Sequence, residues 1–370
     1  MEQRYALALY FLQGASSHTA LQILEHYGSA QAFFEDDAPT EPKLRELLPR
    51  RDEALRRADE ELAFCENNHI QVIPYGDASY PERLKQCADA PIVLFYCGNA
   101  NLNARHVLSI VGTRRITEYG RDICRELTRE LASLLPDVVV VSGLAYGVDI
   151  CAHRGALQNN LQTIGVLAHG LDRIYPAHHR DTAAKMVRQG GLLTEYPRFT
   201  VPEKGNFVRR NRIVAGIAEA TIVVESAEKG GALITARLAQ DYNRDVYAFP
   251  GRTTDQYSRG CNALISGNIA SLITSAQDFL LAQGWMTQQE GASQPIQRTL
   301  FPELTDQELQ ILTSLVQAEK KTISQLVAET ALPFNRVNAL LVSMELKGLV
   351  RALPGGLYRS LLSFEELVQP

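Results

Sequence analysis

The sequence predicts an α/β protein in three parts, and three features of its 370 residues support this fold class. From about residue 67, short β-rich runs alternate with amphipathic helices, as in a parallel sheet covered on both faces. Residues 301–360 predict three helices and then two strands, the order of a winged helix. The chain also exceeds a single domain of roughly 100–200 residues. We therefore expect a helical domain over 1–66, an α/β domain over 67–283, a linker over 284–300 and a winged-helix domain over 301–360.

Each part is predicted from its own hydrophobic pattern. Residues 1–66 place apolar side chains at helical spacing and predict a small helical bundle. The central part contains continuous apolar runs, which are typical of strands buried on both faces. Residues 284–300 are Gln-rich and lack apolar periodicity, which indicates a linker. The predicted central strands are Val107–Val111, Val138–Ser142, Thr163–Leu167, Leu192–Glu195, Thr221–Glu225, Val246–Phe249 and Ser271–Ile273.

The composition excludes several classes of protein. No apolar run approaches the ~20 residues that cross a bilayer, so we expect a cytoplasmic protein with no membrane contact. The six cysteines include no CxxC pair, and we expect no metal, no cofactor and no disulfide framework. The net charge of −5 hides an uneven distribution, because residues 1–66 hold 13 acidic and 7 basic residues whereas residues 67–300 hold 21 and 24. A nucleic-acid partner therefore remains compatible with the charge.

The first motif is a glycine loop between a buried strand and a helix, in the run VVVVSGLAYGVDICAHRGAL. Gly143 and Gly147 allow backbone N–H groups to approach an anion at the amino end of the following helix, so the loop predicts an anion cradle. It lacks the GxGxxG pattern of a dinucleotide site. Ser142, Asp149 and His153 resemble a hydrolytic triad, but no GxSxG turn exposes the serine, so we favour structural roles.

The second motif is a basic cluster in the run RFTVPEKGNFVRRNRIVAGI. Two aromatic residues, Phe199 and Phe207, lie among its cations, which suits a single-stranded nucleic acid whose phosphates bind cations and whose bases stack on rings. Arg114 and Arg115 follow the first predicted parallel strand and would reach the same edge of a doubly wound sheet. Five basic residues face the single acid Glu203 in this run, namely Arg198, Lys204, Arg209, Arg210 and Arg212.

A third strand-loop-helix motif, VVESAEKGGALITARLA, places Lys229 and Gly230 at a turn. It does not match the P-loop pattern GxxxxGK[ST], so an ATP-driven motor is not expected. Three loops that accept anions would then meet at one sheet edge and form a groove.

These motifs resemble the DNA-processing protein A family (DprA/Smf) across essentially the whole chain. The resemblance rests on IVGTRRITEYG, SGLAYGVDICAHRGAL, GLDRIYP, LLTEYP, RRNRIVAG, VVESAEKGGALITARLA, YAFPG and SRGCNALI in order. It implies an extended Rossmann-like central domain between an N-terminal SAM-like helical domain and a winged helix. It also implies a homodimer that binds and protects incoming single-stranded DNA during natural transformation and loads the RecA recombinase onto it, without enzymatic activity.

The resemblance also assigns site residues. Arg114 and Lys204 match positions that meet DNA phosphates, and the surrounding pocket is matched by Ser142, Gly143, Phe207, Arg210, Asn211 and Lys229. Together with Arg209, Arg212 and Gly230 from the local patterns, these are the predicted DNA-binding residues. The chain departs from the family where it has Val208 in place of the usual proline, and Gly230 in place of the usual serine after Lys229.

Two other functions fit parts of the sequence. A nucleotide-binding Rossmann-like hydrolase could use the phosphate cradle beside Glu195 or Glu225, although its expected GGxGTxxE loop is absent from the sequence. A winged-helix regulator would use residues 333–347 for recognition, but only Arg336 and Lys347 are basic there, so a protein contact is an equal alternative to duplex binding.

Overall fold

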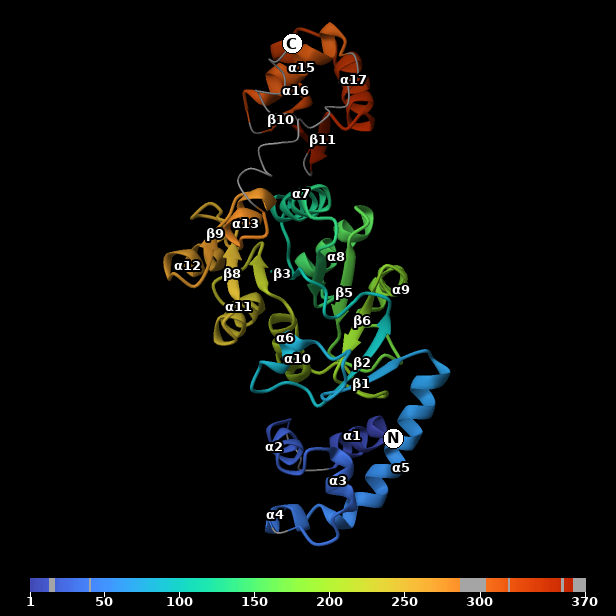
Figure 1. Cartoon of the computed structure of the whole chain (residues 1–370). Helices are drawn as coiled ribbons and strands as arrows, with labels where there is room; N and C mark the ends of the chain where they lie inside the picture. The colour runs from blue at the N-terminus through green and yellow to red at the C-terminus, as the bar shows by residue number, and fades with distance from the viewer. Residues whose placement is uncertain (13–16, 40, 287–303, 319, 354–355, 362–370) are drawn as a thin grey trace. The chain divides into compact units, whose positions relative to one another are not determined.

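The computed structural model describes residues 1–12, 17–39, 41–286, 304–318, 320–353 and 356–361, and the chain forms two compact units, residues 1–291 and 292–370 (Figure 1). The linker predicted over 284–300 falls almost entirely outside the described residues. In the part of the chain that the structure describes, no helix is both long and apolar enough to cross a membrane.

The first unit contains a nine-stranded, mostly parallel sheet in the order β1-β2-β6-β5-β4-β3-β7-β8-β9. Strands β3 to β9 are parallel and match the seven predicted strands, whereas β1 and β2 add an antiparallel edge. This confirms the α/β fold class. The strands are β1 (Gln71–Pro74), β2 (Val93–Gly98), β3 (Val107–Val111), β4 (Val139–Ser142), β5 (Gln162–Val166), β6 (Gly190–Thr194), β7 (Ala220–Val223), β8 (Asp245–Ala248) and β9 (Ser271–Leu272).

Helices cover both faces of this sheet, because each carries a stripe of apolar residues that must leave water. One core contains residues of α6 (Glu82–Lys85), α10 (Lys204–Ile217), α11 (Gly231–Asp241) and α12 (Arg259–Ser266). A second core contains residues of α7 (Glu118–Leu134), α8 (Val148–Gln158) and α13 (Ala276–Ala282). A smaller cluster packs α9 (Arg180–Arg188) beside α8 and β6.

The predicted N-terminal helices are present, and they share a core with the edge of the sheet. Buried residues of these helices pack with Val72, Val93 and Phe95, so they belong to the first compact unit. Gln3 donates a hydrogen bond of 2.8 Å to the carbonyl of Val72. The helices are α1 (Glu2–Phe11), α2 (Ser17–Tyr27), α3 (Ala30–Glu35), α4 (Pro42–Arg45) and α5 (Arg51–Asn67).

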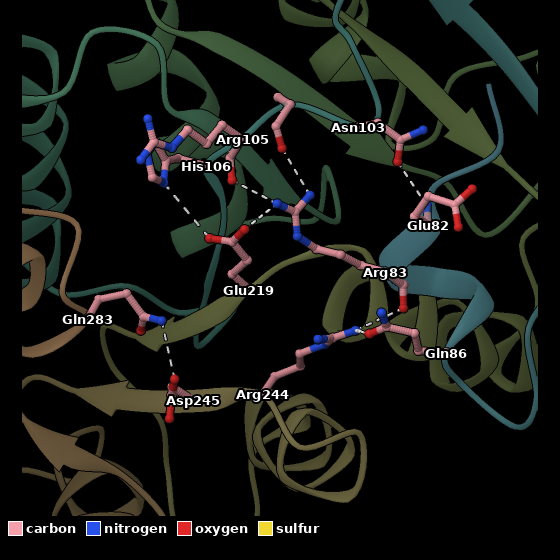
Figure 2. Close-up of polar contacts among 11 residues, drawn as sticks. Glu82, Arg83, Gln86, Asn103, Arg105, His106, Glu219, Arg244, Asp245 and Gln283 are labelled. Atoms are coloured by element: carbon pink, nitrogen blue, oxygen red, sulfur yellow. Dashed lines mark hydrogen bonds and ion pairs between the residues drawn. The ribbon is translucent and has the colours of Figure 1, made fainter. Parts of the chain in front are cut away.

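A polar network stabilises the amino ends of the central strands (Figure 2). Arg83 of α6 pairs with Glu219, which precedes β7, and donates to the carbonyls of Ala104 and Arg105 just before β3. Arg244, which precedes β8, donates to the Arg83 carbonyl at 2.9 Å. These contacts fix the edge opposite the predicted site, because the parallel strands all start here.

The second unit is a winged helix, as predicted. Its first helix begins with a capping box, in which Thr305 and Glu308 satisfy each other's backbone N–H groups. A short third strand, β10, precedes the second helix and was not predicted. The elements are α15 (Asp306–Val316), β10 (Lys321–Thr322), α16 (Ile323–Thr330), α17 (Phe334–Leu346), β11 (Val350–Leu353) and β12 (Leu357–Ser360).

Candidate nucleic-acid interface

The candidate site lies at the carboxyl edge of the parallel strands. The chain leaves β3 toward β4 on one side, and β7 pairs with β3 on the other side, so the direction of the strand order changes at β3. Loops after β3 and β7 therefore diverge there and open a crevice, the usual ligand position in such sheets.

A groove of about 650 Å³ occupies this crevice, and we call it the basic groove. It is built from the loop after β3, the first half of α10 and the amino end of α11. Seven of the eleven predicted DNA-binding residues line it. Its lining residues are Arg114, Lys204, Phe207, Val208, Arg210, Asn211, Glu228, Lys229, Gly230, Gly231, Leu233, Ile234 and Arg237.

Four exposed cations give the basic groove its charge. Arg114, Lys204, Lys229 and Arg237 are exposed, and no ion pair joins any of them to a carboxylate among the described residues. Of the residues that the structure describes, Glu228 is the one acid that lines the groove. A groove with this excess of positive side chains attracts a phosphate backbone.

The loop that carries Arg114 is held in place by Glu225 at the end of β7. The Glu225 carboxylate accepts hydrogen bonds from the Thr117 N–H at 2.9 Å and the Thr117 hydroxyl at 2.5 Å. The Glu225 carbonyl accepts the Thr113 N–H at 2.7 Å. A Cβ on Gly112 would lie 2.4 Å from Val148, so only glycine allows this close approach. Glu225 is therefore committed to positioning the loop.

A smaller pocket adjoins the basic groove and shares Arg114 and Phe207 with it; we call it the aromatic pocket. The Arg114 guanidinium lies 5.2 Å from the Phe207 ring centroid, a cation–π distance. Tyr175, half exposed, lies 5.9 Å from the same ring, and Tyr146 is also exposed at the rim. The remaining lining residues are Gly143, Leu144, Ala145, Leu167, Ala168, His169 and Pro176.

Two predicted phosphate contacts are buried. Arg210 is 4% exposed and donates to the carbonyls of Gly143 and Val166. Arg212 is 6% exposed, pairs with the buried Glu195 at 2.5 Å and donates to the Asp89 carbonyl. Burial lowers the pKa of Arg210 and raises that of Glu195. The direct phosphate contact predicted for these arginines is not retained, because their guanidinium groups already bind protein oxygens.

The other predicted residues divide between groove and interior. Arg209 is exposed on α10 but points into a neighbouring hollow with Glu195 and Tyr10, not into the basic groove. Ser142 is fully buried and its hydroxyl donates to the Ile110 carbonyl at 2.6 Å, so it lines neither pocket. Gly143 lines the aromatic pocket, and Asn211 lines the basic groove.

The glycine loop after β4 is shaped by packing rather than by an open anion cradle. A Cβ on Gly143 would lie 2.2 Å from the Arg210 guanidinium. Gly147 has a φ of +81°, and a Cβ there would lie 2.1 Å from the Thr113 carbonyl oxygen. The Asp149 carboxylate accepts the Ala145 N–H at 3.3 Å and so occupies the loop itself. The predicted cradle is therefore filled by protein groups.

The superficial triad is not assembled. His153 is fully buried, its Nδ1 lies 2.7 Å from the Thr163 hydroxyl, and burial lowers its pKa to about 3. The Ser142 hydroxyl is bonded to a carbonyl and not to this ring. The two side chains are therefore not arranged as a nucleophile and its base. This agrees with the structural roles that the sequence favours for them.

Comparisons with known proteins place the chain in a family. The family model described as DNA recombination-mediator protein A matches residues 71–283, and the DprA winged helix domain matches residues 297–356. The chain belongs to the DNA recombination-mediator protein A family. The Protein Smf of Synechocystis, another member, is 35% identical over 78% of this chain and 80% of its own. The DNA processing protein DprA of Bacillus subtilis is 40% identical over 59% and 73%.

Solved DprA structures share the fold. The X-ray structure of DNA processing protein A from Streptococcus pneumoniae has a TM-score of 0.65 and 31% identity, covering 75% of this chain and 97% of its own. The DNA processing protein A of Helicobacter pylori, whose structure concerns its single-stranded DNA binding mode, has a TM-score of 0.52 and 31% identity, with 58% and 94% covered. The family resemblance seen in the motifs is thereby confirmed.

The winged helix of this DprA-family chain presents few free cations on its candidate recognition helix. Arg336 of α17 donates to Gln307 at 2.8 Å, and Lys347, which caps the carboxyl end of this helix, pairs with Glu308 at 2.6 Å. Phe334, Val342 and Leu346 are exposed on the same helix. The helix therefore has an apolar exposed surface, which agrees with the poor phosphate binding expected from its sequence.

Among the residues that line the groove and the pocket, one cation and two tyrosines were not predicted. Arg237 lies in α11 three residues after the exposed Ile234, and this helical spacing was the available signal. Tyr146 and Tyr175 lie within motifs quoted for the family but carry no charge pattern. Only the fold brings these two rings to the rim beside Phe207.

Proposed function

We propose that this protein binds single-stranded DNA in the basic groove, with phosphates on Arg114, Lys204, Lys229 and Arg237 and bases on the rings of the aromatic pocket. The observation that carries this proposal is the junction of four exposed cations with the Arg114–Phe207 stack. Cations alone would accept any polyanion, whereas rings beside them favour unpaired bases. The Helicobacter pylori relative, whose structure concerns single-stranded DNA binding, supports the same choice.

The protein acts as a binding and loading factor rather than a catalyst, in the cytoplasm and as a homodimer, protecting incoming DNA during natural transformation and loading RecA onto it. Membership of a family described as recombination mediators supports this role. The commitment of Glu225 to the Thr117 loop and of Glu195 to Arg212 supports a binding role over the hydrolase alternative, since both carboxylates already have structural partners.

The first experiment measures binding of a fluorescent oligo-dT and of its duplex by anisotropy across a salt series. We expect tight, salt-sensitive binding to the single strand that collapses in an Arg114→Glu, Lys204→Glu variant. The matched control is Lys43→Glu with Arg56→Glu, which changes the charge equally on α4 and α5, outside both pockets. Equal binding by the groove variant and wild type, or a preference for duplex, would overturn the proposal.

The loading role has its own test. RecA filament formation on single-stranded DNA coated with single-strand-binding protein should accelerate with the wild type and not with the groove variant. Acceleration by the groove variant would show that loading does not need this groove. Turnover of nucleoside monophosphates by the wild type would instead support the hydrolase alternative.

A further inference from the structure

A second basic surface lies between α8 and α9, and no predicted residue belongs to it. It forms a hollow of about 630 Å³, and we call it the α8/α9 hollow. Three cations line it, Arg154, Lys185 and Arg188, and all are exposed. The other lining residues are uncharged, namely Leu157, Gln158, Thr182 and Gln189.

The three cations have no acidic partner in the described parts of the chain. None of them forms an ion pair there, and Asp181, four residues before Lys185 on the same helix, does not pair with it. The Arg154 Nε donates only to the Thr182 hydroxyl, at 3.3 Å. By contrast, Arg121, Arg125 and Arg129 on the neighbouring helix α7 each pair with a glutamate or aspartate three residues away.

The negative ends of the helix dipoles offset only part of the positive charge of these three cations. Lys185 and Arg188 occupy the last turn of α9, where cations complement the carbonyl end of the helix dipole. The carboxyl ends of α8, at Gln158, and of α9, at Arg188, supply about half a negative charge each, so roughly −1 in total faces three full positive charges. Two positive charges therefore remain for a ligand, and the hydroxyl and amides beside them provide hydrogen bonds for phosphate oxygens.

The hollow is connected to the aromatic pocket by α9 itself. His179, just before α9, donates a hydrogen bond of 2.9 Å from its Nδ1 to the Leu144 carbonyl, and its ring lies 5.0 Å from that of Tyr146. From His179 to Arg188 is nine residues, about 14 Å at 1.5 Å per residue. At roughly 3.4 Å per stacked nucleotide, this span equals about four nucleotides. Arg180, also exposed, lies at the start of the path.

We infer that the α8/α9 hollow is a second phosphate-binding site for single-stranded nucleic acid, occupied by nucleotides of a strand that leaves the aromatic pocket along α9. This inference rests on the proposed function of the basic groove. It predicts that a strand of 6 nucleotides, held by the four cations of the groove, ends before the hollow about four nucleotides beyond the aromatic pocket, whereas a strand of 30 nucleotides also gains the contacts of the hollow.

The test compares oligo-dT of 6 and 30 nucleotides on the full chain, with an Arg154→Gln, Arg188→Gln variant. With about 0.7 counterions released per phosphate, losing two contacts weakens 30-mer binding by about 25-fold at 0.1 M salt and makes its salt slope shallower by about 1.4. Binding of the 6-mer should not change. Arg154→Lys with Arg188→Lys should restore the slope, and Lys43→Gln with Arg56→Gln should change neither length.

The outcomes separate the two proposals. Loss of 6-mer binding in the Arg114, Lys204 variant but equal 30-mer binding by the hollow variant and wild type would overturn the second site and leave the groove intact. Weaker 6-mer binding in the hollow variant would overturn the path along α9, because the short strand would then bind the hollow directly. If inorganic phosphate at constant ionic strength removes the affinity that the 30-mer gains over the 6-mer, the hollow is assigned to free phosphate instead.

Discussion

Replacing Arg114 and Lys204 together by glutamine tests how the basic groove holds its ligand. Both side chains are exposed, carry no structural ion pair among the described residues and line the groove. The variant therefore removes two phosphate contacts and leaves the interior unchanged. Glutamine keeps hydrogen-bonding capacity, and the salt slope reports the two lost charges separately from the lost contact between Arg114 and the Phe207 ring.

The size of the effect follows from the number of cations. Four groove cations that each neutralise one phosphate give a slope of log affinity against log salt of about −2.8, at −0.7 per phosphate of a single strand. Between 50 and 200 mM salt the wild type should then lose affinity by about 50-fold. With two cations left, the slope falls to about −1.4 and the loss to about sevenfold.

The assay is anisotropy of a labelled oligo-dT of 6 nucleotides, a length chosen to avoid the α8/α9 hollow. The control variant Lys43→Gln with Arg56→Gln should keep the wild-type slope. An unchanged slope in the Arg114, Lys204 variant would refute the reasoning, because it would show that these two side chains do not meet phosphates.

Three further results are expected. Phe207→Ala should weaken oligo-dT binding by roughly 5- to 150-fold, the worth of one base stack, with an unchanged salt slope; a shallower slope would contradict a stacking role. Arg210→Met should lower the unfolding free energy by about 1–3 kcal/mol in urea titrations because the carbonyls of Gly143 and Val166 lose their donor, and an unchanged stability would contradict its bracing role. The pKa of His153 is about 3 in the folded protein and 6.5 in the unfolded chain, so on acidification the unfolded chain takes up a proton first. This difference should lower the free energy of unfolding by about 2 kcal/mol between pH 7 and pH 5. His153→Asn should remove this contribution from the pH dependence of stability, and a pH profile identical to that of the wild type would refute the reasoning.

The central fold could be predicted because buried parallel strands leave a strong pattern. The runs at β3, β4 and β7 are fully buried and apolar except for one hydroxyl residue each, whereas β1 and β2 were not predicted. These two strands pair antiparallel at the edge, and their burial comes from the N-terminal helices packed beside them. Their pairing depends on residues far away in the chain, which a local pattern does not contain.

The site could be predicted only in part, for a physical reason that Arg210 and Lys204 illustrate. Both belong to one basic run, yet α10 turns Lys204 to the groove and Arg210 into the interior, 4% exposed. Charge and spacing identify the run. Which cations meet solvent depends on how the helix lies against β4 and β5, and this is set by tertiary packing.

The double role of α10 has a consequence for selectivity between flexible and stiff ligands. Its second half, from Ile213 to Ile217, is buried in the core, while its first half forms the groove wall. A wall continuous with the core has little freedom to adjust, so the shape change on binding falls on the ligand. A single strand bends at each nucleotide, whereas a duplex stays straight over about 150 base pairs. Under the proposed function, the anchoring of this one helix would let the protein distinguish nucleic acids by their flexibility, before any base is read.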